Sequence, residues 1–533
     1  MKKLYFGDNL DILREHIADE SVDLVYLDPP FNSKRDYNLL FKSPKGHASD
    51  AQITAFEDSW HWGEQAEREY NELLRQSNTD VAEMMRALRS FLGENDMMAY
   101  LVMMANRLIE LHRALKSTGS LYLHCDPIAS HYLKIVLDGV FGKENFRNEL
   151  VWRRSHPKGQ AFTRFANNHD VILAYSKDNK LTKWNPSYKA YDEETVKKQY
   201  SLKDEDGRYY QLTSLLNPNP DRPNLTYEFK GKTRVWRWTQ ERMLEADAAG
   251  RIVVPRGGEG IPRYKRYLDE QEGIPVDDFW DDIELVSGKE SLGYPTQKPL
   301  ALLERIINAS SNPGDVVLDP FCGCGTAVHA AEKLGREWIG IDITNLAISL
   351  IEKRLRDAFP SISFEVEGTP KDLASATDLA VRDKYQFQWW ACGLVGAQPY
   401  QGKKKGSDGG IDGLIFFQDD TEGAKKIIVS VKGGENISVV MIRDLVGTLD
   451  REKAEIGIFV TLAEPTKPMV TEAVSAGYYE SPAGKSYPKV QILTIEELLA
   501  KTKRAEYPDL TSGGLTFKKA QREKKKSGQE GMF

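Results

Sequence analysis

The sequence predicts an α/β fold: a doubly wound parallel sheet that carries an inserted segment, followed by a second, smaller α/β unit. Short buried apolar runs alternate with stretches of helical spacing over residues 1–147 and again over 299–341. Two of these runs end at a turn made of Asp with Pro or Gly, and the intervening residues 148–282 lack the alternation. The chain has 533 residues, which leaves room for about three or four domains of ordinary size.

The elements of the parallel sheet are expected in two groups. The first comprises strands at 4–6, 22–27 and 120–124 and helices at 9–16, 98–115 and 130–140. The second comprises helices at 299–310 and 326–334 and strands at 316–318 and 338–341. The strand at 22–27 is followed by Asp28-Pro29-Pro30. The residue before a proline prefers an extended conformation, which fits a strand that leads into this motif. The long helix is expected to end at Ser117-Thr118-Gly119, and a polar segment fills the residues before Asp96.

Residues 368–378 are interpreted as a link to the second unit. That unit is expected to contain a helix around Trp389 and Trp390, a loop over 403–412 and strands at 413–417, 427–431 and 456–461. The final Lys-rich residues are expected to be flexible. The predicted domain bounds are therefore 1–147 with 283–367, an inserted region at 148–282, a C-terminal domain at 368–502 and a tail at 503–533.

Composition excludes some classes of protein and leaves others open. No apolar run is long enough to span a bilayer and the start lacks a signal-peptide core, so we expect no membrane partner and a cytoplasmic location. The four cysteines, Cys125, Cys322, Cys324 and Cys392, form neither a disulfide framework nor a zinc pattern. The net charge of −7 does not decide DNA binding, because phosphate contacts need only a local basic stripe. Candidate stripes are Arg153, Arg154, His156 and Lys158, and Lys403 to Lys405.

The first motif that indicates chemistry is the glycine loop at 319–326, which reads Asp-Pro-Phe-Cys-Gly-Cys-Gly-Thr between a strand and a helix. Glycines at such a bend let the backbone approach a ligand closely, and the helix N-terminus favours polar or anionic groups. Asp342 ends the next strand, where an acid in a Rossmann-like sheet accepts hydrogen bonds from ribose hydroxyls. The loop and the acid together indicate a nucleoside cofactor.

The second motif is Asp28-Pro29-Pro30-Phe31, also at the carboxyl end of a strand, where open α/β sheets bind ligands. An adenine amino group is a poor nucleophile because its lone pair is delocalised into the ring. A carboxylate, with a backbone carbonyl held by prolines, can accept both amino hydrogens and position the nitrogen to attack a sulfonium methyl. Phe31 offers a face on which an extruded base can stack.

Together these motifs resemble the amino-methylating DNA methyltransferases of the β class, in which the Asp-Pro-Pro-Tyr/Phe motif precedes the cofactor loop. The resemblance covers about residues 1–365 and implies S-adenosylmethionine as cofactor and duplex DNA as partner. The cofactor-binding residues that it implies are Asp8 of Gly7-Asp8-Asn9, Thr296 and Lys298 of Pro295-Thr296-Gln297-Lys298-Pro299, then Asp319, Phe321, Gly323, Gly325, Thr326 and Asp342. The implied catalytic residues are Asp28, Pro29, Pro30 and Phe31. Leu123-His124-Cys125-Asp126 resembles a less specific pocket element.

Two features refine this resemblance. Cys324 stands where the family usually has Ser, and we expect a small change in packing without loss of binding. Asp28 at the head of the catalytic motif favours adenine N6 over cytosine N4, because the cytosine enzymes of the class more often carry Ser there. The middle region stands where the family carries target recognition, and its candidate DNA contacts are Trp152, Arg153, Arg154, Arg234, Trp236, Arg237 and Trp238.

The C-terminal unit resembles the Mrr-like branch of the PD-(D/E)xK restriction endonucleases. The likeness rests on Asp408-Gly409-Gly410-Ile411-Asp412-Gly413 and Ser430-Val431-Lys432. The resemblance implies that Asp412 holds Mg²⁺ and Lys432 helps activate water. Ser430 stands where the family has Glu or Gln and is a poorer metal ligand, for which Asp408 or Glu435 would have to compensate.

The expected function is therefore site-specific adenine-N6 methylation of duplex DNA, in restriction–modification or phage defence. Cytosine-N4 methylation and a non-catalytic DNA-binding protein with a nuclease-like domain stay open. Methylation of RNA or protein, and a nucleotide-dependent oxidoreductase, are weaker alternatives, and the second leaves Asp28 to Phe31 unexplained. DNA cleavage, a restriction subunit as partner and a homodimer also stay open.

Overall fold

The computed structural model describes residues 2–30, 36–42, 48–57, 61–76, 79–156, 165–288, 290–292, 294, 296–400, 410–420, 423–508 and 520–523. The chain divides into two compact units, one formed by Met1–Asn185 with Asp278–Phe533 and the other by Pro186–Asp277. Among the helices of these described ranges, none combines the length and apolar character that a membrane span requires.

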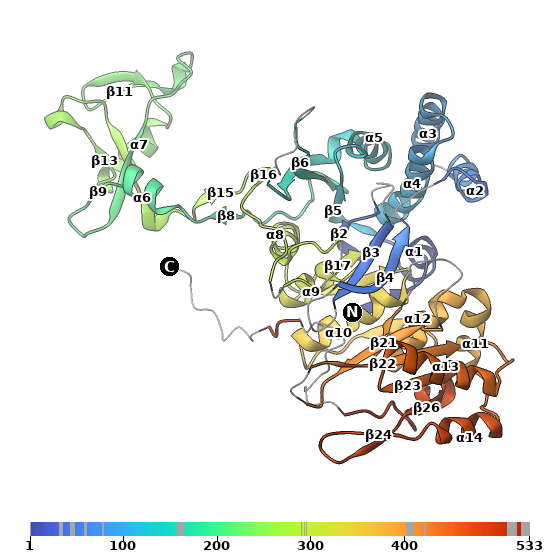
Figure 1. Ribbon diagram of the computed structural model, residues 1–533. Helices are drawn as coiled ribbons and strands as arrows, with labels where there is room; N and C mark the ends of the chain where they lie inside the picture. Colours follow the sequence, from blue (N-terminus) through green and yellow to red (C-terminus); the bar gives the residue numbers. More distant parts are fainter. Residues whose placement is uncertain are drawn as a thin grey trace. The chain divides into compact units, whose positions relative to one another are not determined.

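A large mixed sheet organises the N-terminal part of the first unit (Figure 1). Within the described residues its strands are, in sheet order, β16 (Phe279–Trp280), β6 (Phe146–Arg153), β7 (His169–Ser176), β5 (Leu115–Cys125), β2 (Val22–Leu27), β17 (Val316–Asp319), β18 (Glu337–Asp342), β1 (Lys2–Phe6) and β19 (Glu365–Glu367). The strands from β5 to β19 run parallel, whereas β7 is antiparallel to both β5 and β6. The predicted doubly wound α/β class is confirmed, with an antiparallel strand added beside its parallel part.

Helices cover both faces of this sheet, as right-handed crossovers require (Figure 1). One face carries α1 (Asn9–His16), α4 (Asp96–Ala114) and α5 (Ser130–Phe141), and the other carries α8 (Leu300–Ser310), α9 (Thr326–Lys333) and α10 (Asn345–Ala358). The segment read from the sequence only as polar contains α2 (Glu64–Leu73) and α3 (Thr79–Leu92), together with a two-stranded sheet of β3 (Asp36–Lys42) and β4 (Ala48–Glu57).

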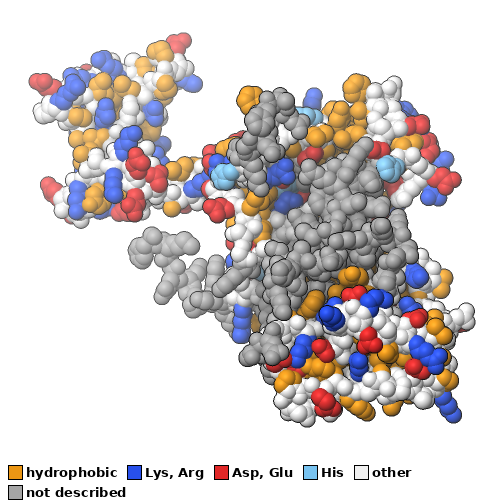
Figure 2. Space-filling model, in the orientation of Figure 1, with side chains coloured by type: hydrophobic (Ala, Val, Ile, Leu, Met, Phe, Trp, Pro, Cys, Tyr) orange, Lys and Arg blue, Asp and Glu red, His pale blue; other side chains and the backbone are white. Residues whose placement is uncertain are grey.

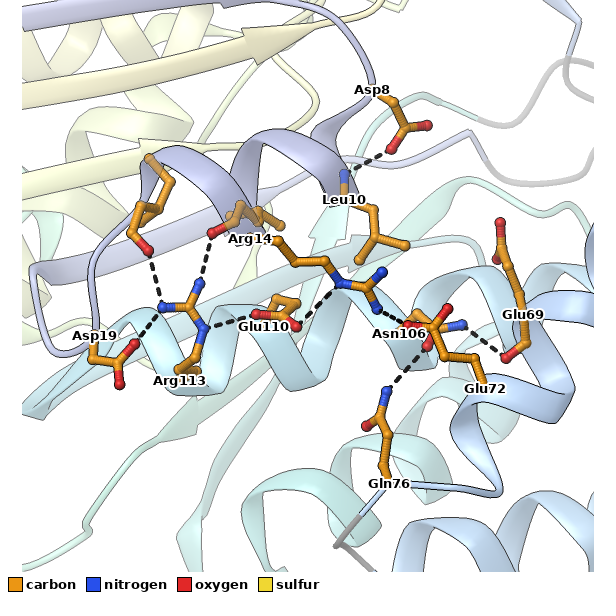
Figure 3. A network of polar contacts seen from close by, with 12 residues as sticks. Asp8, Leu10, Arg14, Asp19, Glu69, Glu72, Gln76, Asn106, Glu110 and Arg113 are labelled. Carbon is orange, nitrogen blue, oxygen red and sulfur yellow. Dashed lines mark hydrogen bonds and ion pairs between the residues drawn. The ribbon is translucent and has the colours of Figure 1, made fainter.

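A charged network fixes α1 against α4 (Figure 3). Arg113 of α4 donates to Asp19 and Glu110 and to the backbone carbonyls of α1 and its end. Arg14 of α1 donates to Glu72 and Glu110 at 2.6 and 3.3 Å. Asp8 caps α1 by accepting from the backbone N–H of Leu10 at 2.7 Å. The loop between β1 and α1 is therefore held at a fixed place on the sheet edge.

The second unit is formed by residues 186–277 and has its own small core around the fully buried Trp236. Its elements are β8 (Tyr188–Lys189), α6 (Glu193–Gln199), β9 (Leu202–Lys203), β10 (Tyr209–Ser214), β11 (Thr226–Phe229), β12 (Lys232–Val235), α7 (Gln240–Ala248), β13 (Ile252–Val253), β14 (Arg263–Tyr267) and β15 (Ile274–Pro275). The unit is shorter than the region expected at 148–282, because β6, β7 and β16 belong to the large sheet. Its first and last strands, β8 and β15, pair with each other.

The C-terminal part of the first unit is a smaller α/β layer with its own apolar core. Its five-stranded sheet has the order β20 (Gln398–Pro399), β21 (Gly413–Phe417), β22 (Lys425–Lys432), β23 (Ile456–Thr461) and β26 (Val490–Thr494) within the described ranges. Its remaining elements are α11 (Leu373–Arg382), α12 (Lys384–Leu394), α13 (Val439–Glu452), α14 (Lys467–Ser475), β24 (Tyr478–Glu480), β25 (Ser486–Pro488) and α15 (Ile495–Leu499). Helix α11 occupies much of the segment that was interpreted as a link.

Candidate active site

Four acidic residues follow four neighbouring parallel strands of the large sheet. Asp28 follows β2, Asp319 and Asp342 end β17 and β18, and Asp8 comes two residues after β1. Because β2, β17, β18 and β1 are consecutive in the sheet, their carboxyl ends bring these side chains to one edge. A cavity of about 260 Å³ opens there and is lined by all four acids. The sequence motifs separated by about 300 residues therefore form one site.

The glycine loop forms one wall of this cavity. Gly323 and Gly325 both have left-handed backbone conformations, with φ of +52° and +73°. A Cβ at Gly323 would lie 3.3 Å from the ring of Tyr294, and one at Gly325 would lie 2.8 Å from Ile351. The backbone therefore takes a path that a side chain would obstruct, and Gly325 ends it as the N-cap of α9. Gly325 does not line the cavity, whereas Phe321, Gly323 and Thr326 do.

Asp342 is fixed by the loop that it faces. One of its carboxylate oxygens accepts from the backbone N–H and the hydroxyl of Thr344, each at 2.9 Å, and the other accepts from the N–H of Gly323 at 2.9 Å. Burial raises the pKa of Asp342 to about 6 in spite of these hydrogen bonds. Burial and the nearby charges of Asp28 and Asp342 raise the pKa of Asp319 well above its ordinary value. The cavity wall thus holds four carboxyl groups together with the cationic side chains of Lys298 and Arg107.

Asp28 lies just after the carboxyl end of β2, beside Lys298, with which it forms a close ion pair. Both side chains are largely buried, with 17% and 11% of their surfaces exposed. Pro29, Pro30 and Thr296 line the same cavity. Phe31 and Pro295 lie outside the described residues, so the expected stacking role of Phe31 stays a prediction.

Arg107 of α4 is a cavity residue that the sequence motifs did not reveal. Its guanidinium donates to both carboxylate oxygens of Asp8, at 3.2 and 3.1 Å, and to the side chain of Asn9 at 2.5 Å. Asn9 in turn donates to the carbonyl of Pro320 at 2.8 Å. Arg107 therefore ties the Gly-Asp-Asn turn to the glycine loop. The only local signal was a lone Arg in an apolar helix, which does not identify its partners.

In the C-terminal sheet, three predicted residues converge. The carboxylate of Asp412 accepts from the backbone N–H of Val431 at 2.7 Å and from the hydroxyl of Ser430 at 3.4 Å. The ammonium of Lys432 lies 3.8 Å from the same oxygen. The other oxygen accepts from the amide of Gln388 on α12 at 2.9 Å, a contact that the sequence did not predict. Glu435 is exposed, and Asp408 and Lys403 to Lys405 lie outside the described residues.

These donors fit a magnesium ion poorly. Mg²⁺ binds through carboxylates and usually retains several waters. Across the described ranges no group of three or more His, Cys, Asp or Glu side chains is placed to hold a metal ion. Asp412 is the acid at this point, and its two oxygens already accept hydrogen bonds. No metal-dependent step follows from this donor set.

Two candidate DNA contacts of the middle region, Trp152 and Trp236, serve as core residues instead. Trp152 is 1% exposed and donates its indole N–H to the carbonyl of Ile283 at 3.0 Å. Trp236 is fully buried in the second unit. Lys and Arg side chains of that unit mix with Asp and Glu on its surface (Figure 2), and Arg208, for example, pairs with Asp269 and Glu270. Lys158 lies outside the described residues.

Comparison with known families decides the classification. A family model described as DNA methylase matches residues 22–353, which is more than half of the chain. The chain belongs to the DNA methylase family. A second model, described as restriction endonuclease, matches residues 382–498. Both resemblances drawn from the sequence are thereby confirmed.

Individual relatives of this methylase cover it in part. It is 37% identical over 262 residues to the type II methyltransferase M.EcaI of Enterobacter cloacae, a match of 48% of this chain and 57% of that one. It is 25% identical to the StyLTI Mod subunit of Salmonella typhimurium over 62% of this chain and 50% of the relative. The chain therefore spans about half the length of these two relatives. A solved DNA modification methylase of Thermus thermophilus, in complex with S-adenosyl-L-methionine, aligns with 69% of this methylase and 100% of that chain at 16% identity and a TM-score of 0.34.

Proposed function

We propose that this methylase transfers a methyl group from S-adenosylmethionine to N6 of adenine at a specific site in duplex DNA, within restriction–modification or phage defence. The observation that carries the proposal is that Asp28 and Pro29 share one cavity with the glycine loop and Asp342. An acceptor for an amino group and a site for a nucleoside cofactor are thus adjacent. Because the substrate is cellular DNA, we also propose a cytoplasmic location.

The residues present fit S-adenosylmethionine. Asp342 has carboxylate lone pairs for ribose hydroxyls, and Asp8, held by Arg107, faces the cavity beside it. The methionine end would be held by Thr296, Lys298 and the loop from Asp319 through Phe321, Gly323 and Gly325 to Thr326. When bound, the cofactor supplies an electrophilic methyl group.

The chain's own contribution to the reaction is positioning. Asp28 accepts one amino hydrogen of the extruded base, and the Pro29 carbonyl, held rigid by the following proline, accepts the other. Lys298 pairs with Asp28 and keeps its carboxylate at the cavity until the base arrives. The nitrogen lone pair is then directed towards the methyl group. Duplex DNA is the proposed partner, and the second unit is proposed to read the target sequence.

Adenine is favoured over cytosine by the Asp at position 28 and by one relative. The chain is 25% identical to YhdJ of Escherichia coli K12, named a DNA adenine methyltransferase, over 66% of this chain and 82% of that one. Cytosine N4 would use the same geometry, because both bases present a planar exocyclic amino group.

The test is single-molecule modification sequencing of DNA from a methylation-free host that expresses the chain, beside the Asp28→Ala variant. A modified adenine in a defined sequence, absent with the variant, is expected. Modified cytosine N4 would correct the base and keep the site. An unmodified genome, or modification that persists with Asp28→Ala, would contradict the proposal.

A second candidate function is DNA cleavage by the C-terminal sheet. The approach of Lys432 to Asp412 favours it, whereas the lack of a group of three or more potential metal ligands among the described residues favours a DNA-binding role without cleavage. Unmodified DNA incubated with the chain and Mg²⁺ separates the two. Cuts that require Mg²⁺ and vanish with Asp412→Asn establish cleavage, whereas binding without cuts establishes the platform role.

A further inference from the structure

Beneath the base-binding end of the cavity lies a buried chain of hydrogen bonds that the proposed function does not use. The Tyr26 hydroxyl lies 3.0 Å from Nδ1 of His124, and Nε2 of His124 lies 3.2 Å from the carboxylate of Asp170. The three residues come from β2, β5 and β7, which are neighbours in the sheet. They are 2%, 0% and 3% exposed. Burying such polar groups costs folding free energy unless each of them is hydrogen-bonded.

The chain begins at the candidate catalytic residues. Tyr26 precedes Asp28 by two residues on the same strand end and lines the cavity together with Asp28 and Pro29. The Trp152 ring packs edge-to-face against the His124 ring, with 5.9 Å between the ring centroids. It covers the side of His124 away from Tyr26. His124 is therefore reached from the cavity through Tyr26.

The charges around the chain set its proton positions. Burial alone would raise the pKa of Asp170, but the hydrogen bond from His124 and the nearby Arg154 and Lys298 outweigh it and lower that pKa. An ionised Asp170 accepts from Nε2 of His124, so Nδ1 is left as the acceptor of the Tyr26 proton. Burial and the charges of Asp28, Asp319 and Asp170 raise the pKa of Tyr26 well above its ordinary value, which excludes a standing phenolate.

The reaction needs a destination for a proton. When the amino nitrogen bonds to the methyl carbon, it becomes positively charged and must lose one hydrogen. The Asp28 carboxylate already has a cationic partner in Lys298, so another acceptor for the hydrogen is of interest. Tyr26 has its own proton directed at His124, which leaves its oxygen lone pairs for a proton from the cavity.

We propose that Tyr26, His124 and Asp170 form a proton relay that takes up the hydrogen released by methyl transfer; the inference rests on the proposed function. As the C–N bond forms and the methyl–sulfur bond breaks, the amino hydrogen that Asp28 first accepts passes to Tyr26: its N–H bond breaks and an O–H bond forms at Tyr26. In the same step the original Tyr26 O–H bond breaks and an N–H bond forms at Nδ1 of His124. Tyr26 ends as a phenol and His124 as an imidazolium facing Asp170. The proton leaves through Tyr26 when the cavity empties.

The geometry separates two kinds of role within the relay. In the proposed step Tyr26, which lines the cavity, contacts the amino group and is the catalytic residue of the three. His124 and Asp170 act through it and are positioning residues for the proton. Besides Tyr26 and Asp170, the charged groups that face this chain are Arg154 and Lys298 on the Asp170 side and Asp28 and Asp319 on the Tyr26 side.

The test is single-turnover methyl transfer to DNA from a methylation-free host, measured between pH 5.5 and 9 with labelled S-adenosylmethionine. Tyr26→Phe removes the relay's first oxygen, and His124→Asn keeps an acceptor near Nδ1 that cannot hold the proton. Each is expected to lower the rate by about 10²-fold at neutral pH, with cofactor Kd unchanged. The relay needs an acceptor at Nδ1 of His124, so the wild-type rate is expected to change with pH, whereas the rate of His124→Asn is expected to stay constant.

The matched control is Tyr122→Phe. Tyr122 lies on β5 two residues before His124, is 5% exposed and bonds Ser310 at 2.6 Å, yet does not line the cavity. Its variant is expected to transfer methyl groups at the wild-type rate. Variants of Tyr26 and His124 that match this control in rate and pH profile would overturn the relay. So would a loss that appears only as weaker cofactor binding.

Two further outcomes are distinguishable. A wild-type chain that labels no base overturns the proposed function and the relay together, whereas an active wild type with unaltered variants overturns the relay alone. If His124→Asn does not fold, Tyr26→Phe decides the matter, because it removes one oxygen and retains the ring.

Discussion

The pKa of Asp342, raised to about 6 by burial, predicts a pH dependence of cofactor affinity. As the pH falls through about 6 this carboxyl gains a proton and loses acceptor capacity for Gly323 and for ribose hydroxyls. The affinity for S-adenosylmethionine is therefore expected to fall below that pH, by up to about tenfold per pH unit. Calorimetric titration between pH 5 and 8 measures it. Asp342→Asn should bind more weakly at every pH and with a flat profile, and a wild-type profile that is equally flat would contradict the prediction.

Arg107 makes a second prediction at the level of single side chains. Replacing Arg107 with Met removes the donors that hold Asp8 and Asn9, so the cofactor Kd is expected to rise about tenfold. Arg113→Met is the matched control, since this arginine lies on the same helix and anchors α1 without lining the cavity. Titration of both variants with S-adenosylmethionine checks the difference. Equal losses of affinity would show that Arg107 acts through general stability.

Some residues of the site were predictable from the sequence motifs and others were not. Asp28, Asp319 and Asp342 were placed together because each ends a predicted parallel strand, and parallel strands end at one edge. The contacts of Arg107 and of the trio of Tyr26, His124 and Asp170 were not predicted, because they join positions 46 to 99 residues apart without a local pattern. Of these residues the motifs named only His124, as part of the pocket element at 123–126. Trp152 and Trp236 show the opposite case: their aromatic character suggested DNA contact, and burial makes them core.

At the level of elements, the turn from β17 into α9 depends on its glycines, and most strongly on Gly325. Gly325→Ala would place a Cβ 2.8 Å from Ile351 in a left-handed backbone, at an expected cost of roughly 2–4 kcal/mol of unfolding free energy. Gly335→Ala, at the other end of α9, has φ of +72° with no neighbour within 4 Å and should cost roughly 1 kcal/mol. Thermal or urea unfolding compares the two. A smaller loss at Gly325 than at Gly335 would contradict the role assigned to Ile351.

Elements were predicted best where apolar periodicity is strong. The strands expected at 413–417 and 456–461 match β21 and β23 at both ends. Strands β6 and β7 were assigned to the inserted region, because an antiparallel pair added to a parallel sheet has no glycine-loop motif to identify it. Helices α2 and α3 were missed since many of their residues are polar, and only one face of each is buried.

For the whole molecule, the paired ends of the second unit predict that it can be removed. Lys189 of β8 and Ile274 of β15 are direct strand partners, so a two-residue Asn-Gly turn can replace the 84 intervening residues, 190–273. The shortened chain is expected to fold and to bind S-adenosylmethionine with unchanged Kd, while losing sequence-specific modification. Unfolding curves, cofactor titration and modification sequencing check these expectations. Loss of cofactor binding would show that the large sheet depends on the second unit.

The strand pair that closes the second unit has a consequence for how such enzymes change over evolutionary time. A module whose entry and exit lie side by side can be exchanged by recombination without moving the residues on either flank. Asp28, Asp319 and Asp342 are all encoded outside that interval. New target sequences could then be acquired by trading the module between lineages, while the methyl-transfer chemistry passes on unaltered.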